Sequence, residues 1–246
     1  MKIIGIIPAR YGSTRFPGKP LAMIHGKSMI QRVVQQASQA SSISAVLVAT
    51  DDRRILKHVI ELGYNAVMTS ENHPSGTDRC LEALEKSGLH ADAVINIQGD
   101  EPFVSPHQID ALANLISKPE VEIATLAKRI HDAESLFDTN RVKVVISADH
   151  KALYFSRQAI PFQKNNPQDH WLLHNHYFKH IGLYAYKTSV LKEICKMKPS
   201  LLEMAESLEQ LRWLENGKSI YISETDVETP AVDTKEDLER LLKSGL

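Results

Sequence analysis

Cysteine is scarce in this sequence, which has only Cys80 and Cys195 among its 246 residues, far apart from one another. A C-x-x-C redox or metal motif is therefore excluded, and the sparse use of cysteine is typical of a reducing cytosol. Net charge is nearly absent as well, because the formal charge is only −1. The chain has no overall positive field that would attract nucleic acid or an anionic membrane, so any charge that matters is local.

Long hydrophobic runs are also missing. The apolar run at Ile3–Ile7 is ended by Pro8 and Arg10, whereas a membrane-spanning helix needs about 20 apolar residues. No later stretch comes close, and the N-terminal run is too short for a signal peptide. We therefore expect a soluble, cytoplasmic protein that binds neither membranes nor nucleic acid.

The length and the apolar pattern favour one large α/β domain. Unbroken apolar runs at Ile3–Ile7, Ala45–Ala49 and Ala93–Ile97 are typical of strands that are buried on both faces. Stretches with helical spacing follow each of them. This alternation predicts a mostly parallel, Rossmann-like sheet flanked by helices, joined by right-handed crossovers.

The pattern changes between residues 123 and 186. Short β-rich runs at Ile123–Leu126, Val142–Ile146 and Ala152–Phe155 follow one another without long helices between them, and a longer strand is expected at Tyr177–Tyr186. This segment predicts either an antiparallel extension of the sheet or a small β-rich lid sub-domain. With no linker in the sequence, we expect a single domain over 1–246 with a β-rich insertion at roughly 123–186.

A basic loop follows the first expected strand. The sequence PARYGSTRFPGKP at 8–20 places Arg10, Arg15 and Lys19 among glycines and prolines that allow tight turns and close approach to a ligand. Three cations of this kind suit a polyphosphate, because arginine grips phosphate oxygens in pairs and lysine adds a point charge. A P-loop and a G-x-G-x-x-G motif are both absent, which disfavours a P-loop NTPase and a dinucleotide dehydrogenase. The alternative is a solvated basic loop.

Two aspartates, Asp100 and Asp233, are candidates to lie near that loop. Asp100 directly follows the run at Ala93–Ile97, and ligands of open α/β sheets bind outside the carboxyl ends of the strands. Carboxylate oxygens together with phosphate oxygens are what Mg²⁺ needs, although Asp100 could equally be a turn residue. Asp233 could cap the last helix, but Thr234 with Asp237 could cap it instead and leave Asp233 free.

Two further stretches carry grouped polar residues. The segment Ser75–Arg79 opens a helix whose backbone N–H groups can serve acceptors, with Asp78 as a helix-start residue. Asp51, after the run at Ala45–Ala49, is expected to cap the next helix. Along the strand at Tyr177–Tyr186, alternation brings His180, Tyr184 and neighbouring polar residues to one face.

Several histidines lie close together before and within that strand. His174 and His176 are expected to lie on one face of a strand, and such a pair could bind zinc. No H-E-x-x-H motif and no cysteine partner accompany them, so surface or hydrogen-bonding histidines are the favoured interpretation. With Arg157, the face of His180 and Tyr184 could instead line a pocket for a polyhydroxylated acid.

The basic loop resembles the signature of the sugar-nucleotide cytidylyltransferases, P-A-R-Y-x-S-T-R-x-P-x-K-P, in the form found in the 3-deoxy-manno-octulosonate (KDO) cytidylyltransferases. Further motifs of that family match at S-G-T-D-R (75–79), H-I-G-x-Y (180–184), L-E-Q-L-R (208–212) and V-D-T-x-E-D-L (232–238). The matches run from the first strand to the last helix. The resemblance implies transfer of CMP from CTP to KDO, giving CMP-KDO for lipopolysaccharide synthesis and pyrophosphate, with Mg²⁺ as cofactor. It also implies a homodimer, whose interface we expect within the β-rich insertion.

The resemblance assigns roles residue by residue. The expected CTP-binding residues are Arg10, Ser13, Arg15, Lys19, Ser75 and Arg79. The expected sugar-binding residues are Gln98, Arg157, His180, Tyr184, Glu209 and Gln210. The expected catalytic residues are Arg10, Lys19, Asp100 and Asp233, of which Asp100 and Asp233 would hold Mg²⁺.

Three alternatives remain open at this point. A relative that acts on the 8-amino analogue of KDO, or on a sialic acid, would differ only around the distal end of the sugar. A nucleotide sensor without activity could keep the basic loop, although sensing does not require a pair of metal-binding carboxylates. A zinc hydrolase could be built on the histidines.

Overall fold

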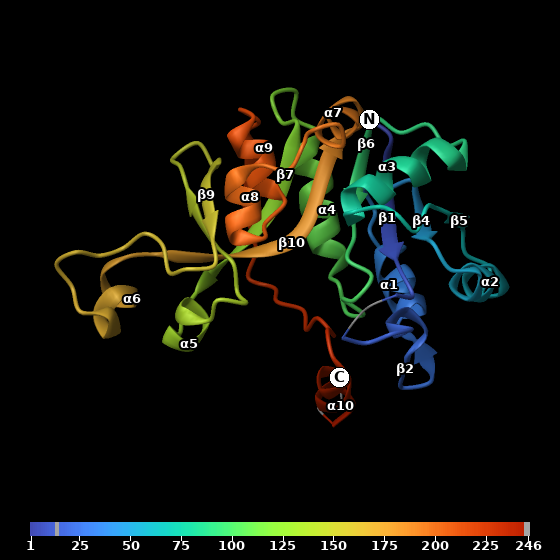
Figure 1. Ribbon diagram of the computed structural model, residues 1–246, viewed down its shortest axis with the longest axis horizontal. Helices are drawn as coiled ribbons and strands as arrows, with labels where there is room; N and C mark the ends of the chain where they lie inside the picture. The colour runs from blue at the N-terminus through green and yellow to red at the C-terminus, as the bar shows by residue number, and fades with distance from the viewer. Residues whose placement is uncertain (13–14, 244–246) are drawn as a thin grey trace.

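The computed structural model describes residues 1–12 and 15–243, and its centre is a mixed sheet covered by helices on both faces (Figure 1). Within the described residues the sheet has nine strands, in the order β11-β7-β10-β6-β1-β4-β5, with β8 and β9 attached through β10. β1, β4, β5 and β6 pair in parallel, as do β7 and β11, whereas β10 runs antiparallel to both of its neighbours β6 and β7. The predicted α/β class with a mostly parallel, helix-flanked sheet is confirmed.

The elements have the following bounds. The strands are β1 (Ile3–Ala9), β2 (Met23–Ile24), β3 (Lys27–Ser28), β4 (Ala45–Thr50), β5 (Ala66–Met68), β6 (Ala93–Asn96), β7 (Ile123–Ile130), β8 (Lys143–Ile146), β9 (Ala152–Ser156), β10 (Tyr177–Lys187) and β11 (Ile220–Glu224). The α-helices are α1 (Met29–Ala37), α2 (Arg53–Glu61), α3 (Gly76–Ser87), α4 (Pro106–Ile116), α5 (Ala133–Phe137), α6 (Trp171–His174), α7 (Thr188–Ile194), α8 (Leu201–Glu206), α9 (Gln210–Glu215) and α10 (Lys235–Lys243). Short 3₁₀ turns lie at Lys19–Leu21 and Gln168–His170.

The unbroken apolar sequence of β1 follows from its central position. Ile3 and Ile7 pack into one hydrophobic core with α1, α2 and α4, while Ile4 and Ile6 pack into the other core with α3, α7 and α9. Successive side chains of a strand point to opposite faces, so a strand covered on both sides must be apolar at every position. The loops at the carboxyl end of β1 are thereby held on a rigid base.

The β-rich segment at 123–186 is continuous with the main sheet. β7 and β10 are interior strands of that sheet, and β8 and β9 form an antiparallel extension beside the outer part of β10. Figure 1 shows β10 reaching beyond the other strands toward α6. The expected role of this segment in sugar binding and dimerisation stays a prediction.

An irregularity interrupts the pairing of β10 with β7. The register shifts between Ile181 and Tyr184, and the Thr125 hydroxyl of β7 lies 3.2 Å from the Ile181 carbonyl oxygen and 2.8 Å from the Leu183 carbonyl oxygen. A bulge of this kind re-aims the backbone where a regular ladder would not reach. Here it presents the Gly182 carbonyl to the carboxyl end of β6.

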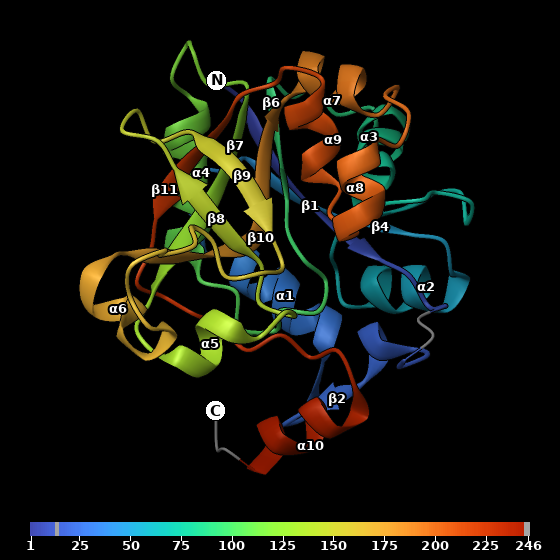
Figure 2. The same ribbon diagram turned by 60° about the vertical axis from the view of Figure 1, so that its left-hand side comes forward.

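The last part of the chain returns across the sheet edge to the loop after β1. After β11, residues 225–234 lead to α10, which lies beside β2 in both views (Figures 1 and 2). Val232 and Leu241 pack with Phe16, Ile24 and Met29 in a small separate core. The Val232 N–H donates to the Asp100 carbonyl oxygen at 2.9 Å, which ties this segment to the turn after β6.

No helix of the described chain has the length and apolarity needed to cross a membrane.

Candidate active site

A pocket opens at the carboxyl end of β1. Its walls come from the loop between β1 and Lys19, the loop before α3, the turn after β6 and the segment before α10. Eight of the predicted site residues line it together: Arg10, Arg15, Lys19, Ser75, Arg79, Gln98, Asp100 and Asp233. Ser13, predicted to bind CTP, lies outside the described residues. The expectation that Asp100 and the basic loop share a crevice is confirmed.

Lys19 joins the two aspartates. Its Nζ atom lies 2.8 Å from Asp100 Oδ2 and 3.4 Å from Asp233 Oδ1, and its side chain is only 13% exposed. Arg15 contributes a second cation, with Nη2 at 3.1 Å from Asp233 Oδ1, from a position that is 64% exposed. Two carboxylates from distant parts of the chain therefore converge on one point and are balanced by cations of the basic loop.

Asp233 is not needed as a helix cap. The Asp237 N–H donates to Thr234 Oγ1 at 3.1 Å, and the Thr234 N–H donates to Asp237 Oδ2 at 2.8 Å, which is the reciprocal arrangement of a capping box. The predicted cap by Thr234 and Asp237 is confirmed, and the Asp233 carboxylate is left to face the pocket.

The carboxylate pair fits a magnesium ion by its chemistry. Mg²⁺ is usually held by one or two carboxylates, with phosphate oxygens and water completing its coordination. Across residues 1–12 and 15–243, no cluster of three or more histidine, cysteine or acidic side chains could hold a metal without a ligand's help. Asp100 and Asp233 match a site of two carboxylates that phosphate oxygens and water complete. Their assignment to Mg²⁺ stays a prediction.

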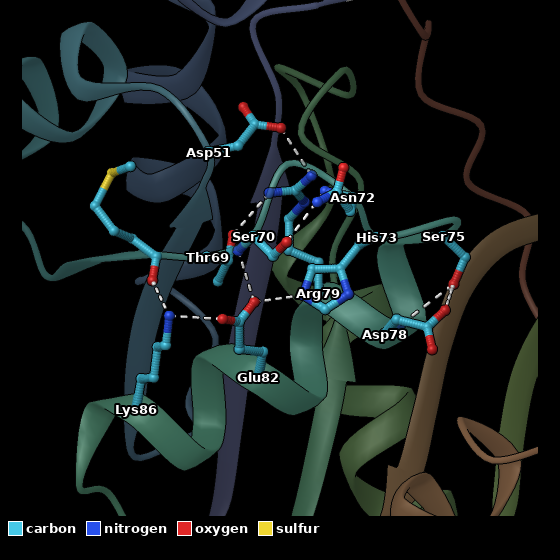
Figure 3. Close-up of polar contacts among 11 residues, drawn as sticks. Asp51, Thr69, Ser70, Asn72, His73, Ser75, Asp78, Arg79, Glu82 and Lys86 are labelled. Carbon is cyan, nitrogen blue, oxygen red and sulfur yellow. Dashed lines mark hydrogen bonds and ion pairs between the residues drawn. The ribbon is translucent and has the colours of Figure 1, made fainter.

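Arg79 is fixed by a partner that sequence reasoning missed. Its side chain is 4% exposed, with Nη2 at 2.8 Å from Asp51 Oδ2 and Nη1 at 2.7 Å from Thr69 Oγ1 (Figure 3). The prediction that Asp51 caps α2 is wrong, because Asp52 takes that place and accepts from the Arg54 N–H at 2.8 Å. Asp51 instead orients a pocket-lining guanidinium. The sequence hinted at this role only through the position of Asp51, directly after β4 and so at the carboxyl end of a strand.

The segment before α3 forms the wall next to Arg79. Ser75 is the N-cap of α3, with Oγ accepting from the Asp78 N–H at 3.2 Å, and that hydroxyl donates to Asp78 Oδ2 at 2.7 Å. Asp78 is thus a helix-start residue, as predicted. His73 also lines the pocket, although no sequence pattern singled it out.

Gly99 allows the turn after β6 to lie against the end of β1. A Cβ atom at this position would stand 2.6 Å from the Pro8 carbonyl oxygen, a backbone atom that cannot move aside. The close approach of two backbones forms part of the pocket wall, since Pro8 and Gly99 both line it.

We expect Gly99→Ala to lower the free energy of unfolding by about 1–3 kcal/mol, the usual cost of overpacking. Gly12→Ala is the matched control, because its Cβ would meet no described atom within 4 Å. Denaturant unfolding of both variants checks the prediction. Equal stability of the two would show that the turn relaxes without cost.

The predicted sugar-binding residues are divided between two places. Gln98 lines the pocket and donates from Nε2 to the Gly182 carbonyl oxygen at 2.9 Å, so it links the pocket to the bulge of β10. The other five do not line the pocket in the described structure: Arg157, His180, Tyr184, Glu209 and Gln210. Their role stays a prediction.

Four of those five lie on β10 and at the start of α9. The His180 and Tyr184 rings are 5.2 Å apart, and Glu209 accepts from the Thr77 hydroxyl of α3 at 2.8 Å. Gln210 is buried in α9. Since Thr77 lies two residues after Ser75, Glu209 lies behind the wall formed by the start of α3.

Arg157 lies elsewhere. Its Nε donates to the Glu206 carbonyl oxygen at 2.7 Å and its Nη1 to the Thr139 carbonyl oxygen at 3.2 Å, which holds the side chain against the end of α8. A role in binding a sugar carboxylate would require the guanidinium to exchange these contacts.

Burial changes the ionisation of this group. Burial, with a smaller contribution from the Lys179 charge, lowers the pKa of His180 to about 3, so its imidazole is neutral. Burial also raises the pKa of Glu209 above its usual range, which favours the protonated carboxyl. The Tyr184 hydroxyl is buried and has no hydrogen-bond partner among the described residues. Burial therefore disfavours charge on both His180 and Glu209.

The histidines considered for zinc do not share a strand face. His174 is the last residue of α6, and His176 precedes β10, where its Nδ1 lies 2.6 Å from Arg129 Nη2. The expected pairing of the two on one strand is wrong because the strand begins only at Tyr177.

Comparisons with known proteins cover almost the whole chain. The family model described as Cytidylyltransferase matches residues 4–220. A Cytophaga hutchinsonii protein named 3-deoxy-manno-octulosonate cytidylyltransferase is 52% identical over 242 residues, which is 98% of this chain and 96% of that protein. A Bacteroides thetaiotaomicron protein of the same name is 54% identical over 241 residues, covering 97% of this chain and 96% of that protein.

Solved structures agree with these relatives. A CMP:2-keto-3-deoxy-manno-octonic acid synthetase complexed with CTP superposes with a TM-score of 0.92 at 42% identity, covering 100% of this chain and 98% of that one. A glucose-1-phosphate thymidylyltransferase from Bacillus anthracis reaches a TM-score of 0.64 at 17% identity, over 98% of this chain and 94% of that one, which is a likeness of fold alone.

Proposed function

The chain belongs to the cytidylyltransferase family, and from that premise we propose that it transfers CMP from CTP to KDO, releasing pyrophosphate and activating KDO for lipopolysaccharide synthesis. The observation that carries the proposal is the pocket itself. It combines three cations suited to a triphosphate with two carboxylates suited to a divalent metal. A pocket for sensing a nucleotide would not need that second feature.

In the proposed reaction the anomeric hydroxyl of KDO attacks the α-phosphorus of CTP. A new oxygen–phosphorus bond forms, the bond to the β-phosphate oxygen breaks, and the hydroxyl proton is released. Arg10, Arg15 and Lys19 stabilise the charge that develops on the departing pyrophosphate. Positioning and charge stabilisation are thus the main contributions of the protein.

Asp100 and Asp233 would hold Mg²⁺. When bound, the ion would neutralise phosphate charge and lower the pKa of the attacking hydroxyl, so that no separate side-chain base is required. Gln98 orients the acceptor, because its hydrogen bond to the Gly182 carbonyl fixes its amide plane at the pocket wall. The convergence of Gln98, Asp100 and Asp233 on one pocket supports these assignments.

The buried polar group on β10 and α9 suits the acceptor. KDO is an anion with many hydroxyls, and an ionised Glu209 close to it would be repulsive. The raised pKa of Glu209 lessens that repulsion, while neutral His180 and the buried Tyr184 hydroxyl can exchange hydrogen bonds with sugar hydroxyls. We therefore assign the sugar to this side of the pocket, with Arg157 and Gln210 at its border.

We also propose a cytoplasmic homodimer. Phe162 and Leu173, at 72% and 75% exposure, lie on the segment between β9 and β10, beyond the edge of the sheet. Exposed apolar side chains grouped on a projecting segment are typical of a protein interface. This supports an interface within the β-rich insertion, and the sparse use of cysteine, typical of a reducing cytosol, supports the location.

The test is pyrophosphate release from CTP and Mg²⁺ with KDO, 8-amino-KDO and N-acetylneuraminate offered in parallel. We expect release with KDO. Release only with the amino sugar would keep the mechanism and change the acceptor. No release with any of the three would contradict the proposal and favour the nucleotide sensor.

Arg15→Ala is expected to raise the KM for CTP by about tenfold while leaving the KM for KDO within about twofold, since an exposed arginine contributes a modest charge-assisted contact. Steady-state kinetics with each substrate varied in turn measure both constants. A larger effect on KDO than on CTP would mean that the basic loop has been assigned to the wrong substrate.

A further inference from the structure

His73 lines the pocket but has no role in the reaction described so far. It stands two residues before the N-cap of α3, beside Pro74, Ser75 and Gly76 of the same wall. Its Nε2 atom contacts Glu82 Oε2 in the second turn of α3. Figure 3 shows that the second ring nitrogen, Nδ1, lies on the side of the ring away from Glu82.

Glu82 is held as a carboxylate by its own partners. Lys86 Nζ lies 2.6 Å from Oε1, and the Ser70 N–H donates to Oε2 at 2.7 Å. Burial alone would raise the pKa of Glu82, but the hydrogen bonds from Lys86, Ser70 and His73 outweigh it and lower the pKa to about 2. An ionised carboxylate can only accept hydrogen bonds, so the proton of a neutral His73 is on Nε2 and Nδ1 carries a lone pair.

No described residue donates to Nδ1, and His73 lines the pocket, so this lone pair is available to a donor of the ligand. Phosphate oxygens are acceptors and are already matched by the cations of the basic loop, so a phosphate is the wrong partner for Nδ1. Cytosine has one donor on its base, the exocyclic 4-amino group, whereas uracil has an oxygen acceptor at the same position. The ribose hydroxyls are the other donors of CTP.

We propose that His73 discriminates the base: its Nδ1 accepts a hydrogen bond from the 4-amino group of cytosine, and Glu82 is the positioning residue that fixes the required tautomer. The proposal rests on the proposed use of CTP. Uracil would place its O4 atom against the Nδ1 lone pair, and two acceptors facing one another without water are unfavourable.

The test is calorimetric binding of CTP and UTP with Mg²⁺ at pH 8.5. We expect the unaltered protein to bind CTP at least ten times more tightly. In His73→Asn the side-chain amide can present either its oxygen or its NH₂ group, so the preference is expected to fall about tenfold. Glu82→Gln removes the fixed tautomer without touching the ligand and should reduce the preference similarly. Glu85→Gln, an exposed glutamate on the same helix, should leave it unchanged.

A structural role alone would weaken CTP and UTP equally and leave their ratio intact. An intact ratio in both His73→Asn and Glu82→Gln would overturn the proposal, as would equal binding of the two nucleotides by the unaltered protein. A third ligand, 2′-deoxy-CTP, separates base from ribose: if His73→Asn abolishes discrimination against it and leaves the CTP to UTP ratio unchanged, the donor is a ribose hydroxyl and the proposal is wrong. Because binding needs no acceptor, these outcomes are independent of whether KDO is turned over.

Discussion

Asp233→Asn is expected to lower kcat by about 10³-fold or more while the protein stays folded. Under the proposed assignment, the substitution removes one of the two carboxylates that would hold Mg²⁺, and with it several kcal/mol of charge stabilisation in the transition state. The substitution is nearly isosteric, and the cap of α10 uses Thr234 and Asp237, so the helix has no need of the lost charge. Pyrophosphate release with CTP and KDO measures the activity, and thermal unfolding measures the fold.

Asp226→Asn is the matched control, because Asp226 is exposed on the same returning segment before α10. It should leave activity unchanged. Near-normal turnover of Asp233→Asn would defeat the assignment of Asp233 as a metal ligand. A second informative measurement is the dependence on Mg²⁺ concentration, which should shift upward in any residual activity of Asp233→Asn and not in the control.

Lys19→Met is expected to lower kcat/KM for CTP by about 10²–10³-fold, the range found when one preorganised stabiliser of transition-state charge is removed. Lys19 is the least exposed cation at the carboxylate pair, at 13% against 64% for Arg15. Its removal leaves Asp100 and Asp233 facing one another with less compensation. The kinetic constants for CTP are the measurement, at saturating KDO.

Lys57→Met provides the control for Lys19→Met, because Lys57 on α2 is 77% exposed and lies outside the pocket. Lys19→Arg keeps the charge in a different shape and should recover part of the loss. A decrease of less than tenfold in Lys19→Met would show that Arg10 and Arg15 suffice for the triphosphate. In that case the lysine would serve mainly as a counter-ion for the two aspartates.

Patterns within short segments predicted the surroundings of the pocket well. The unbroken run at Ile3–Ile7 meant a strand between two cores, and that is where Ile3 and Ile4 are found, on opposite faces. The capping pair Thr234 and Asp237 could be read from spacing alone, because a cap depends on residues three positions apart. Each of these signals depends on residues that are close together in the sequence.

Contacts between distant segments could not be read in the same way. Asp51 and Asp52 are both suitable caps, and only the start of α2 at Arg53 and the approach of Arg79 from 28 residues away decide between them. Strand pairing also depends on contacts between segments that are distant in the sequence. The short runs after residue 123 look alike in sequence, yet β7 is interior to the main sheet and β9 pairs only with β8. Packing of this kind also decides why Gln98 lines the pocket while the other predicted sugar-binding residues do not.

The irregularity of β10 has a consequence for changes in chain length. Pairing with β7 passes from Ile181 opposite Leu126 directly to Tyr184 opposite Thr125, so β10 carries two residues more than its partner. Because two is even, side chains before and after the interruption stay in phase, and His180 remains on the face of Tyr184. Deleting one of the two would turn the outer half of the strand over and carry His180 to the opposite face. Deleting both would preserve the face and slide that half along its neighbour. Insertions and deletions here can therefore keep the acceptor side of the protein intact only in steps of two.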